Sequence, residues 1–107
     1  MPSASESQDA RVAENEATFR RANEALYRRF QELGTADLAP FLCECGDHRC
    51  TQTIRLNLEE YEEVREQRGR FVIVPGHEIL EVERVVEAGE RYDVVESRAE
   101  PADPLFS

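Results

Sequence analysis

The chain has 107 residues, with 23 acidic and 13 basic side chains and a net charge of −10. It has no run of about 18 apolar residues, so the sequence argues against a membrane span. The acidic balance also argues against duplex DNA as a partner, because phosphate binding usually requires a basic surface. This length predicts a single domain, and the charge favours a well-solvated surface that can meet basic partners.

The first residues and the thiols suggest a reducing compartment. Residues 1–6 lack the basic start and the apolar stretch of a secretory signal, so we expect a cytoplasmic protein. Thiols stay reduced there, and clustered cysteines are then metal ligands or reactive groups more often than disulfides. All 13 basic residues are Arg, which is typical of a GC-rich bacterial genome.

Residues 1–8 are polar and Ser-rich, and we expect them to be disordered. A helix is predicted over residues 9–34, because Ala, Glu and Arg dominate there and no Pro or Gly interrupts the run before Gly34. Apolar residues recur along one stripe of this helix. The stripe either packs on the chain's own domain or binds outside it. We predict an interface with a partner protein or a second copy, formed by Val12, Phe19, Leu26 and Phe30.

Residues 41–97 predict a zinc-binding α+β domain, and residues 98–107 a disordered tail. Asn57 and Glu60 have the spacing of a capping box, which predicts a helix from Leu58 to about residue 67. Runs with β-branched residues predict strands at Thr51–Leu56, Phe71–Val74, Val82–Glu87 and Tyr92–Glu96. The expected fold class is therefore α+β. A long N-terminal helix precedes a small zinc-stapled domain, held together by the metal, with one helix and a short, mostly antiparallel sheet.

All three cysteines lie within a single short loop, at Cys43, Cys45 and Cys50. Zn²⁺ is held tetrahedrally by thiolate sulfur and imidazole nitrogen, so three sulfurs leave one coordination position for a fourth ligand. Gly46 and Asp47 allow a tight reversal that returns Cys50 towards the other two cysteines. The C-x-C-x4-C spacing therefore predicts a zinc site.

The fourth ligand is predicted to be His77, one of the two histidines in the chain. It lies in the turn Pro75–Glu78, where a strand is expected to end, so a bound metal would tie that strand to the cysteine loop. His48 is the alternative fourth ligand, although four ligands within one loop would hold little of the chain together. Small domains often need a metal, because their apolar core alone gives too little stability.

Other uses of the cysteines stay open at this stage. A Cys45–Cys50 disulfide, three inert buried cysteines and Cu(I) binding are each compatible with the spacing. Charged neighbours such as Glu44 nevertheless make the loop look too polar for simple burial. A catalytic zinc would need an open coordination position and a general base, either Glu44 or Glu78, and so short a chain offers little material to enclose a substrate.

A site with three thiolates and one neutral His keeps a net negative charge after it binds Zn²⁺. Nearby arginines can offset that charge by donating hydrogen bonds to the sulfurs. We predict this role for Arg49 and Arg55.

Three segments carry a distinctive pattern. Phe41-x-Cys43-Glu44-Cys45-x4-Cys50 is followed by Leu58-x-Glu60-Tyr61-Glu62-x-Val64-Arg65, and then by Phe71 and the turn Pro75-Gly76-His77-Glu78. Together with the helix segment 11–20, this pattern resembles a family of short, uncharacterised actinobacterial proteins, over about residues 10–97. The resemblance favours His77 over His48 as the ligand, because the position of His48 falls in a variable stretch of the pattern. It implies no particular activity.

The sequence thus predicts a small cytoplasmic protein with a structural zinc ion, which acts as a protein-interaction or regulatory module. The alternative is a thiol-based redox or metal sensor, in which oxidation of the thiolates ejects the metal. A small zinc hydrolase is the third reading, and we expect a protein that is not an enzyme. Neither a membrane nor a nucleic acid is expected as a partner.

Overall fold

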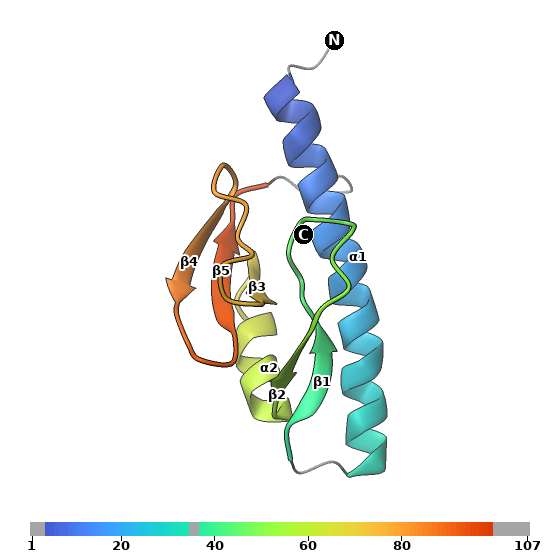
Figure 1. The fold of residues 1–107 in the computed structure, drawn as a ribbon. Helices are drawn as coiled ribbons and strands as arrows, with labels where there is room; N and C mark the ends of the chain where they lie inside the picture. Colours follow the sequence, from blue (N-terminus) through green and yellow to red (C-terminus); the bar gives the residue numbers. More distant parts are fainter. Residues whose placement is uncertain (1–3, 35–36, 100–107) are drawn as a thin grey trace.

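The computed structural model describes residues 4–34 and 37–99, which form an α+β fold (Figure 1). Its elements in chain order are α1 (Ala4–Leu33), β1 (Ala39–Leu42), β2 (Thr53–Leu56), α2 (Leu58–Arg65), β3 (Arg70–Ile73), β4 (Glu83–Glu87) and β5 (Asp93–Ser97). The predicted fold class is confirmed: a long N-terminal helix precedes a small domain of antiparallel strands and one further helix.

Two elements differ from the prediction by more than two residues. Helix α1 begins at Ala4, so residues 4–8 are helical and not disordered. Strand β1 was not predicted, because it contains Pro40 and proline is disfavoured within strands. The segment is nevertheless a strand, because it pairs with β2. Residues 1–3 and 100–107 lie outside the described residues, so the predicted disorder there is untested.

Helix α2 begins where the capping pattern predicts. The backbone N–H of Glu60 donates to Asn57 Oδ1 at 2.8 Å, and the backbone N–H of Asn57 donates to Glu60 Oε1 at 2.9 Å. This reciprocal pair satisfies two backbone donors that the first turn of a helix otherwise leaves unpaired. Tyr61 and Val64 then face the interior on successive turns.

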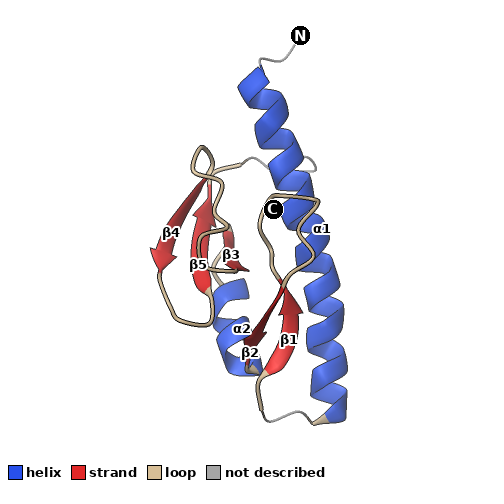
Figure 2. Cartoon of the chain, in the orientation of Figure 1, coloured by secondary structure: helices blue, strands red, loops and turns tan. Residues whose placement is uncertain are grey.

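The strands form two separate antiparallel sheets (Figure 2). In the first, β1 pairs with β2, and Leu42 lies opposite Thr53. In the second, the order is β3-β5-β4, with a bulge in β4 between Val85 and Glu87. Helix α1 runs along the side of the β1–β2 pair in both ribbon views. The cysteine loop connects β1 to β2 and therefore lies against α1.

An aromatic cluster forms the main core between α1, β1 and α2. The rings of Phe41 and Tyr61 are stacked, with centroids 4.5 Å apart and planes within 8°. Phe30 packs edge-on against Phe41 at 5.6 Å, and Tyr27 lies 6.0 Å from Tyr61. Such pairs contribute beyond the area they bury. The C-terminal half of α1 is therefore attached to the domain by apolar contacts.

The predicted partner-binding stripe of α1 is mostly part of the chain's own core. Val12 is only 4% exposed, and Leu26 and Phe30 pack against the aromatic cluster. Phe19 is half-buried and belongs to neither apolar core. Val12 is therefore core and not interface, whereas Leu26 and Phe30 keep part of their surface exposed, and the predicted interface there stays a prediction. The cysteine loop and β1 supply apolar surface for this stripe, through the contacts of Val12 near Gly46 and of Phe30 with Phe41.

Two carboxyl groups meet between α1 and the three-stranded sheet. Glu16 and Glu83 are 2% and 3% exposed. Glu16 Oε1 accepts a hydrogen bond from Ser97 Oγ, and Glu83 Oε1 accepts one from the N–H of Ile79, each at 2.9 Å. The other oxygen of each carboxyl is buried without a partner among the described residues. A proton shared by the pair satisfies both, and burial together with the neighbouring Glu83 raises the pKa of Glu16 to about 10.

We predict that Glu16→Gln makes the fold less sensitive to alkaline pH. The raised pKa of Glu16 gives stability that is complete below about pH 4.5 and is lost as the pH rises towards 10. Gln is neutral throughout and can donate to Glu83. Urea unfolding at pH 6 and pH 9 should show a gain for the variant at pH 9 that is larger by roughly 1–4 kcal/mol. The matched control is Glu14→Gln, at an exposed position of the same helix, and an equal change in both variants would contradict the assignment.

Candidate metal centre

Two loops, the β1–β2 connection and the turn after β3, bring the predicted ligands to one place. Cys43 and Cys45 follow β1, Cys50 precedes β2, and His77 lies in the turn after β3. The N–H of Cys50 donates to the carbonyl of Asp47 at 3.0 Å, which closes the reversal expected at Gly46-Asp47. All three cysteines are free thiols. Antiparallel pairing of β1 with β2 thus holds both ends of the cysteine loop.

The four ligand atoms have the separations of a tetrahedral site. One sulfur or nitrogen from each of Cys43, Cys45, Cys50 and His77 lies within 4.8 Å of all the others. His77 Nδ1 is 3.8 Å from Cys43 Sγ and 3.7 Å from Cys50 Sγ. With Zn–S of about 2.3 Å and Zn–N of about 2.0–2.1 Å, tetrahedral geometry separates such ligands by about 3.6 Å. The donor set therefore suits a metal ion of this size.

Each cysteine sulfur accepts a hydrogen bond from the backbone. The N–H of Val74 lies 3.2 Å from Cys43 Sγ. Backbone hydrogen bonds from Asp47 and Gln52 act in the same way on the other two sulfurs, and all three lower the pKa of the thiol they reach. They favour the thiolate, which is the form that binds metal.

The thiols also compete with one another for negative charge. A hydrogen bond from Cys45 lowers the pKa of Cys43, and the same bond raises the pKa of Cys45. Burial raises the pKa of Cys50. A bound cation offsets this competition, because it favours the ionised form of every sulfur that it contacts.

His48 and the two predicted arginines lie away from the sulfurs. His48 is exposed at the loop and is not one of the four clustered side chains. Arg49, whose side chain is 80% exposed, pairs with Asp47 at 3.2 Å. Arg55 is exposed on β2. Within the described chain neither guanidinium donates to a cysteine, so the predicted Arg49 and Arg55 hydrogen bonds are wrong.

Glu44, between two of the cysteines, is the residue that sequence reasoning misjudged. It is completely buried, although its charge seemed to forbid burial. Its carboxylate accepts from Arg20 Nε (3.0 Å), Arg20 Nη2 (3.1 Å), Asn23 Nδ2 (3.0 Å), Tyr61 Oη (2.8 Å) and the backbone N–H of Val72 (3.0 Å). A carboxylate with so many donors holds the surrounding elements in position. Its oxygens are occupied by these hydrogen bonds, so it is not available as a general base. The available signal for its burial was a polar residue within the apolar stripe of α1, Asn23, which donates to this carboxylate.

The accessible side of the cluster faces a groove of about 980 Å³. The first turns of α1, the cysteine loop and the segment after β3 form its walls. Cys50 and His77 are partly exposed, whereas Cys43 and Cys45 are each 1% exposed. Within the described residues, the side of Cys50 and His77 is therefore accessible to small solutes.

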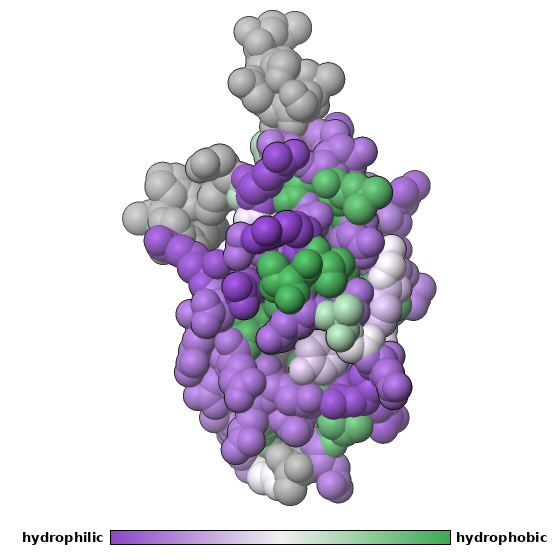
Figure 3. Space-filling model, turned by 90° about the vertical axis from the view of Figure 1, so that its left-hand side faces the viewer, coloured by the Kyte–Doolittle hydropathy of each residue, from purple (hydrophilic) through white to green (hydrophobic). Residues whose placement is uncertain are grey.

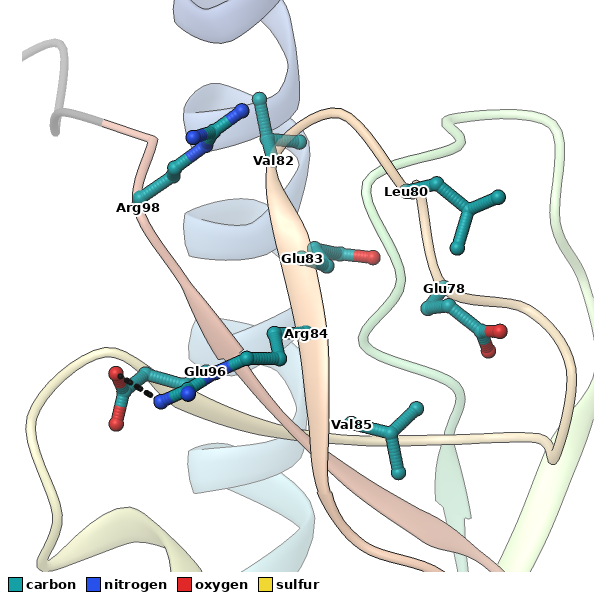
Figure 4. A pocket seen from close by; sticks show the side chains of 8 residues that line it. All are labelled: Glu78, Leu80, Val82, Glu83, Arg84, Val85, Glu96 and Arg98. Carbon is teal, nitrogen blue, oxygen red and sulfur yellow. Dashed lines mark hydrogen bonds and ion pairs between the residues drawn. The ribbon is translucent and has the colours of Figure 1, made fainter.

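A second groove, of about 660 Å³, follows strand β4 (Figure 4). Leu80, which is 80% exposed, lines it together with Val82 and Val85, and the Arg84–Glu96 ion pair lies at its edge at 3.2 Å. The space-filling view of the β4 side shows separate apolar patches on a mostly hydrophilic face (Figure 3). This side offers apolar surface that the described part of the chain does not cover.

Comparison of the chain with protein-family models, curated proteins and solved structures finds no match. The resemblance to the actinobacterial family therefore stays a prediction. No helix among the described residues is long and apolar enough to cross a membrane.

The two histidines provide a direct test of the ligand set. We predict that His77→Ala lowers zinc occupancy and reduces zinc affinity by at least about tenfold, because loss of its nitrogen opens the coordination shell. His48→Ala should leave both unchanged, since His48 lies outside the cluster. Zinc per chain and competition with a coloured chelator measure the two quantities. Equal effects of the two substitutions would contradict the assignment of His77.

Proposed function

We propose that this chain is a small zinc-binding protein whose metal ion is structural. The observation that carries the proposal is the convergence of three cysteine sulfurs and one imidazole nitrogen within 4.8 Å of one another. Thiolates and imidazole are the ligands of structural zinc sites, which are four-coordinate and closed. Four protein ligands leave no position for a reactive water, which favours a structural role over hydrolysis.

We further propose a cytoplasmic protein that acts through contacts with another protein. Reduced thiols are needed for the metal site, and the cytoplasm maintains them. The β4 groove with the exposed Leu80 supports the interaction role, because an accessible apolar surface beside an edge strand suits a protein contact. The cysteine loop and the Pro75–Glu78 turn support a relationship to the short actinobacterial proteins that the sequence resembles.

Removal of the metal tests the structural role. We predict one zinc per chain after purification without added metal. Chelation should lower the melting temperature by roughly 15 °C or more, because the site contributes several kcal/mol and each one shifts the midpoint of a small domain by about 4–8 °C. Addition of zinc should restore the original curve, which serves as the control for chelator side effects. A metal-free preparation with an unchanged melting curve would overturn the proposal.

A thiol-based sensor is the second candidate, and the partial exposure of Cys50 and His77 favours it. Peroxide would oxidise the Cys50 thiolate to a sulfenic acid, and the Cys45 thiolate would then displace hydroxide to form a disulfide and release zinc. We predict zinc release by mild peroxide, reversed by a thiol reductant, with Cys50 modified first in a mass-spectrometric time course. Retention of zinc in millimolar peroxide would exclude this candidate.

A further inference from the structure

Residues 12–23 of α1 are attached to the loop that carries three of the four candidate metal ligands. Asn15 Nδ2 donates to the carbonyl of Gly46 at 2.7 Å. Asn23 Nδ2 donates to the carbonyl of Leu42 at 2.9 Å, and Asn23 Oδ1 accepts from the N–H of Leu42 at 2.8 Å. Asn15 and Asn23 thus bind the backbone at Gly46 and Leu42, on either side of Cys43 and Cys45.

Close packing reinforces this attachment at Gly46. A Cβ atom at this position would lie 2.5 Å from Val12 Cγ1 and 2.9 Å from Ile79 Cδ1. Only glycine allows α1 and the loop to approach so closely. The position of this loop therefore determines whether Val12 has a surface to pack on.

The strongest link lies between Glu44 and Arg20. The Arg20 guanidinium donates two hydrogen bonds to the buried Glu44 carboxylate, and it stacks on Phe71 with 4.6 Å to the ring centroid. A buried ion pair is favourable only while its geometry is maintained, because each charge has lost its water. Glu44 lies between Cys43 and Cys45, so a movement of either cysteine disturbs this pair.

The second half of α1 depends on different contacts. Tyr27 and Phe30 pack on the aromatic cluster, and Glu24 pairs with Arg65 of α2. None of these contacts includes residues 42–46. Within residues 12–23, Glu16 also meets Ser97 and Glu83 of the three-stranded sheet, a contact that does not involve the loop.

We propose that metal occupancy couples to the docking of α1, with Glu44 as the positioning residue. The bound metal holds residues 42–46 in place, and this loop holds residues 12–23 of the helix. Metal loss frees the loop and weakens the docking of residues 12–23, while residues 24–33 stay on the aromatic cluster. The inference rests on the proposed zinc site and adds a metal-responsive element to it. Because coupling between two sites is reciprocal, weakening the helix contacts must also weaken metal binding.

Amide hydrogen exchange of the full chain at low temperature tests the coupling. Zinc-loaded and chelated samples are compared, with zinc content measured on the same material. We expect protection of residues 12–23 to fall at least tenfold more than that of residues 24–33 on chelation. A uniform loss along α1, or no loss, would overturn the proposal.

Zinc affinity provides the reciprocal measurement. The double variant Arg20→Gln/Glu44→Gln keeps the size of both side chains and removes both charges, and we expect zinc affinity to fall at least tenfold. Its Co²⁺ absorption spectrum should match that of the unmodified chain, because the ligands are unchanged. The control Arg65→Gln breaks the pair with Glu24, which does not touch the loop, and should alter zinc affinity by less than twofold. If the double variant fails to fold, Asn15→Ala replaces it, with a smaller loss expected.

The outcomes separate the two proposals. Absence of stoichiometric zinc in the unmodified chain defeats the zinc site itself. Stoichiometric zinc with unchanged affinity in the folded Arg20/Glu44 or Asn15 variant leaves the zinc site standing and defeats only the coupling.

Discussion

The buried carboxylate of Glu44 is the interaction on which the arrangement of this molecule depends. It belongs to the loop that carries Cys43 and Cys45, and donors from α1, α2 and β3 surround it. A charge without water must keep its partners, since each lost donor leaves an expensive unpaired group. The loop, the two helices and the three-stranded sheet are therefore positioned relative to one carboxylate, and the candidate metal ligands on either side of it are positioned with them.

The candidate metal ligands and the aromatic cluster belong to different apolar clusters of the chain. Cys43 and Cys45 pack with Ile73 and Val95 in a small apolar core of their own. The larger core forms around Phe41 and Tyr61, and Val74 packs against both cores. A metal ion beside a separate apolar core suits a protein in which one region can respond to metal while the other keeps its structure. The groove at Cys50 and His77 provides the access that such a response needs.

Local patterns predicted the elements well where the cause is local. The Asn57–Glu60 capping box correctly predicted where α2 begins, because both partners lie within one turn of helix. The cysteine spacing and the turn before His77 pointed to the cluster that the structure contains, because zinc ligands combine a few residue types with tight turns. Strand β1 was missed because no pattern within Ala39–Leu42 predicts a strand. Its pairing partner, β2, lies on the far side of the cysteine loop in the sequence.

The sequence by itself determined the two helices, most of the strands and the four candidate ligands, because periodicity, capping and donor chemistry act over short distances. Only the tertiary structure decided that the stripe of α1 faces its own domain, that Glu44 is buried and that Glu16 meets Glu83. Each of these depends on a partner that is distant in sequence. Burial of a charged side chain is favourable only when its distant partners surround it in the folded chain. No local sequence pattern predicts that they will do so.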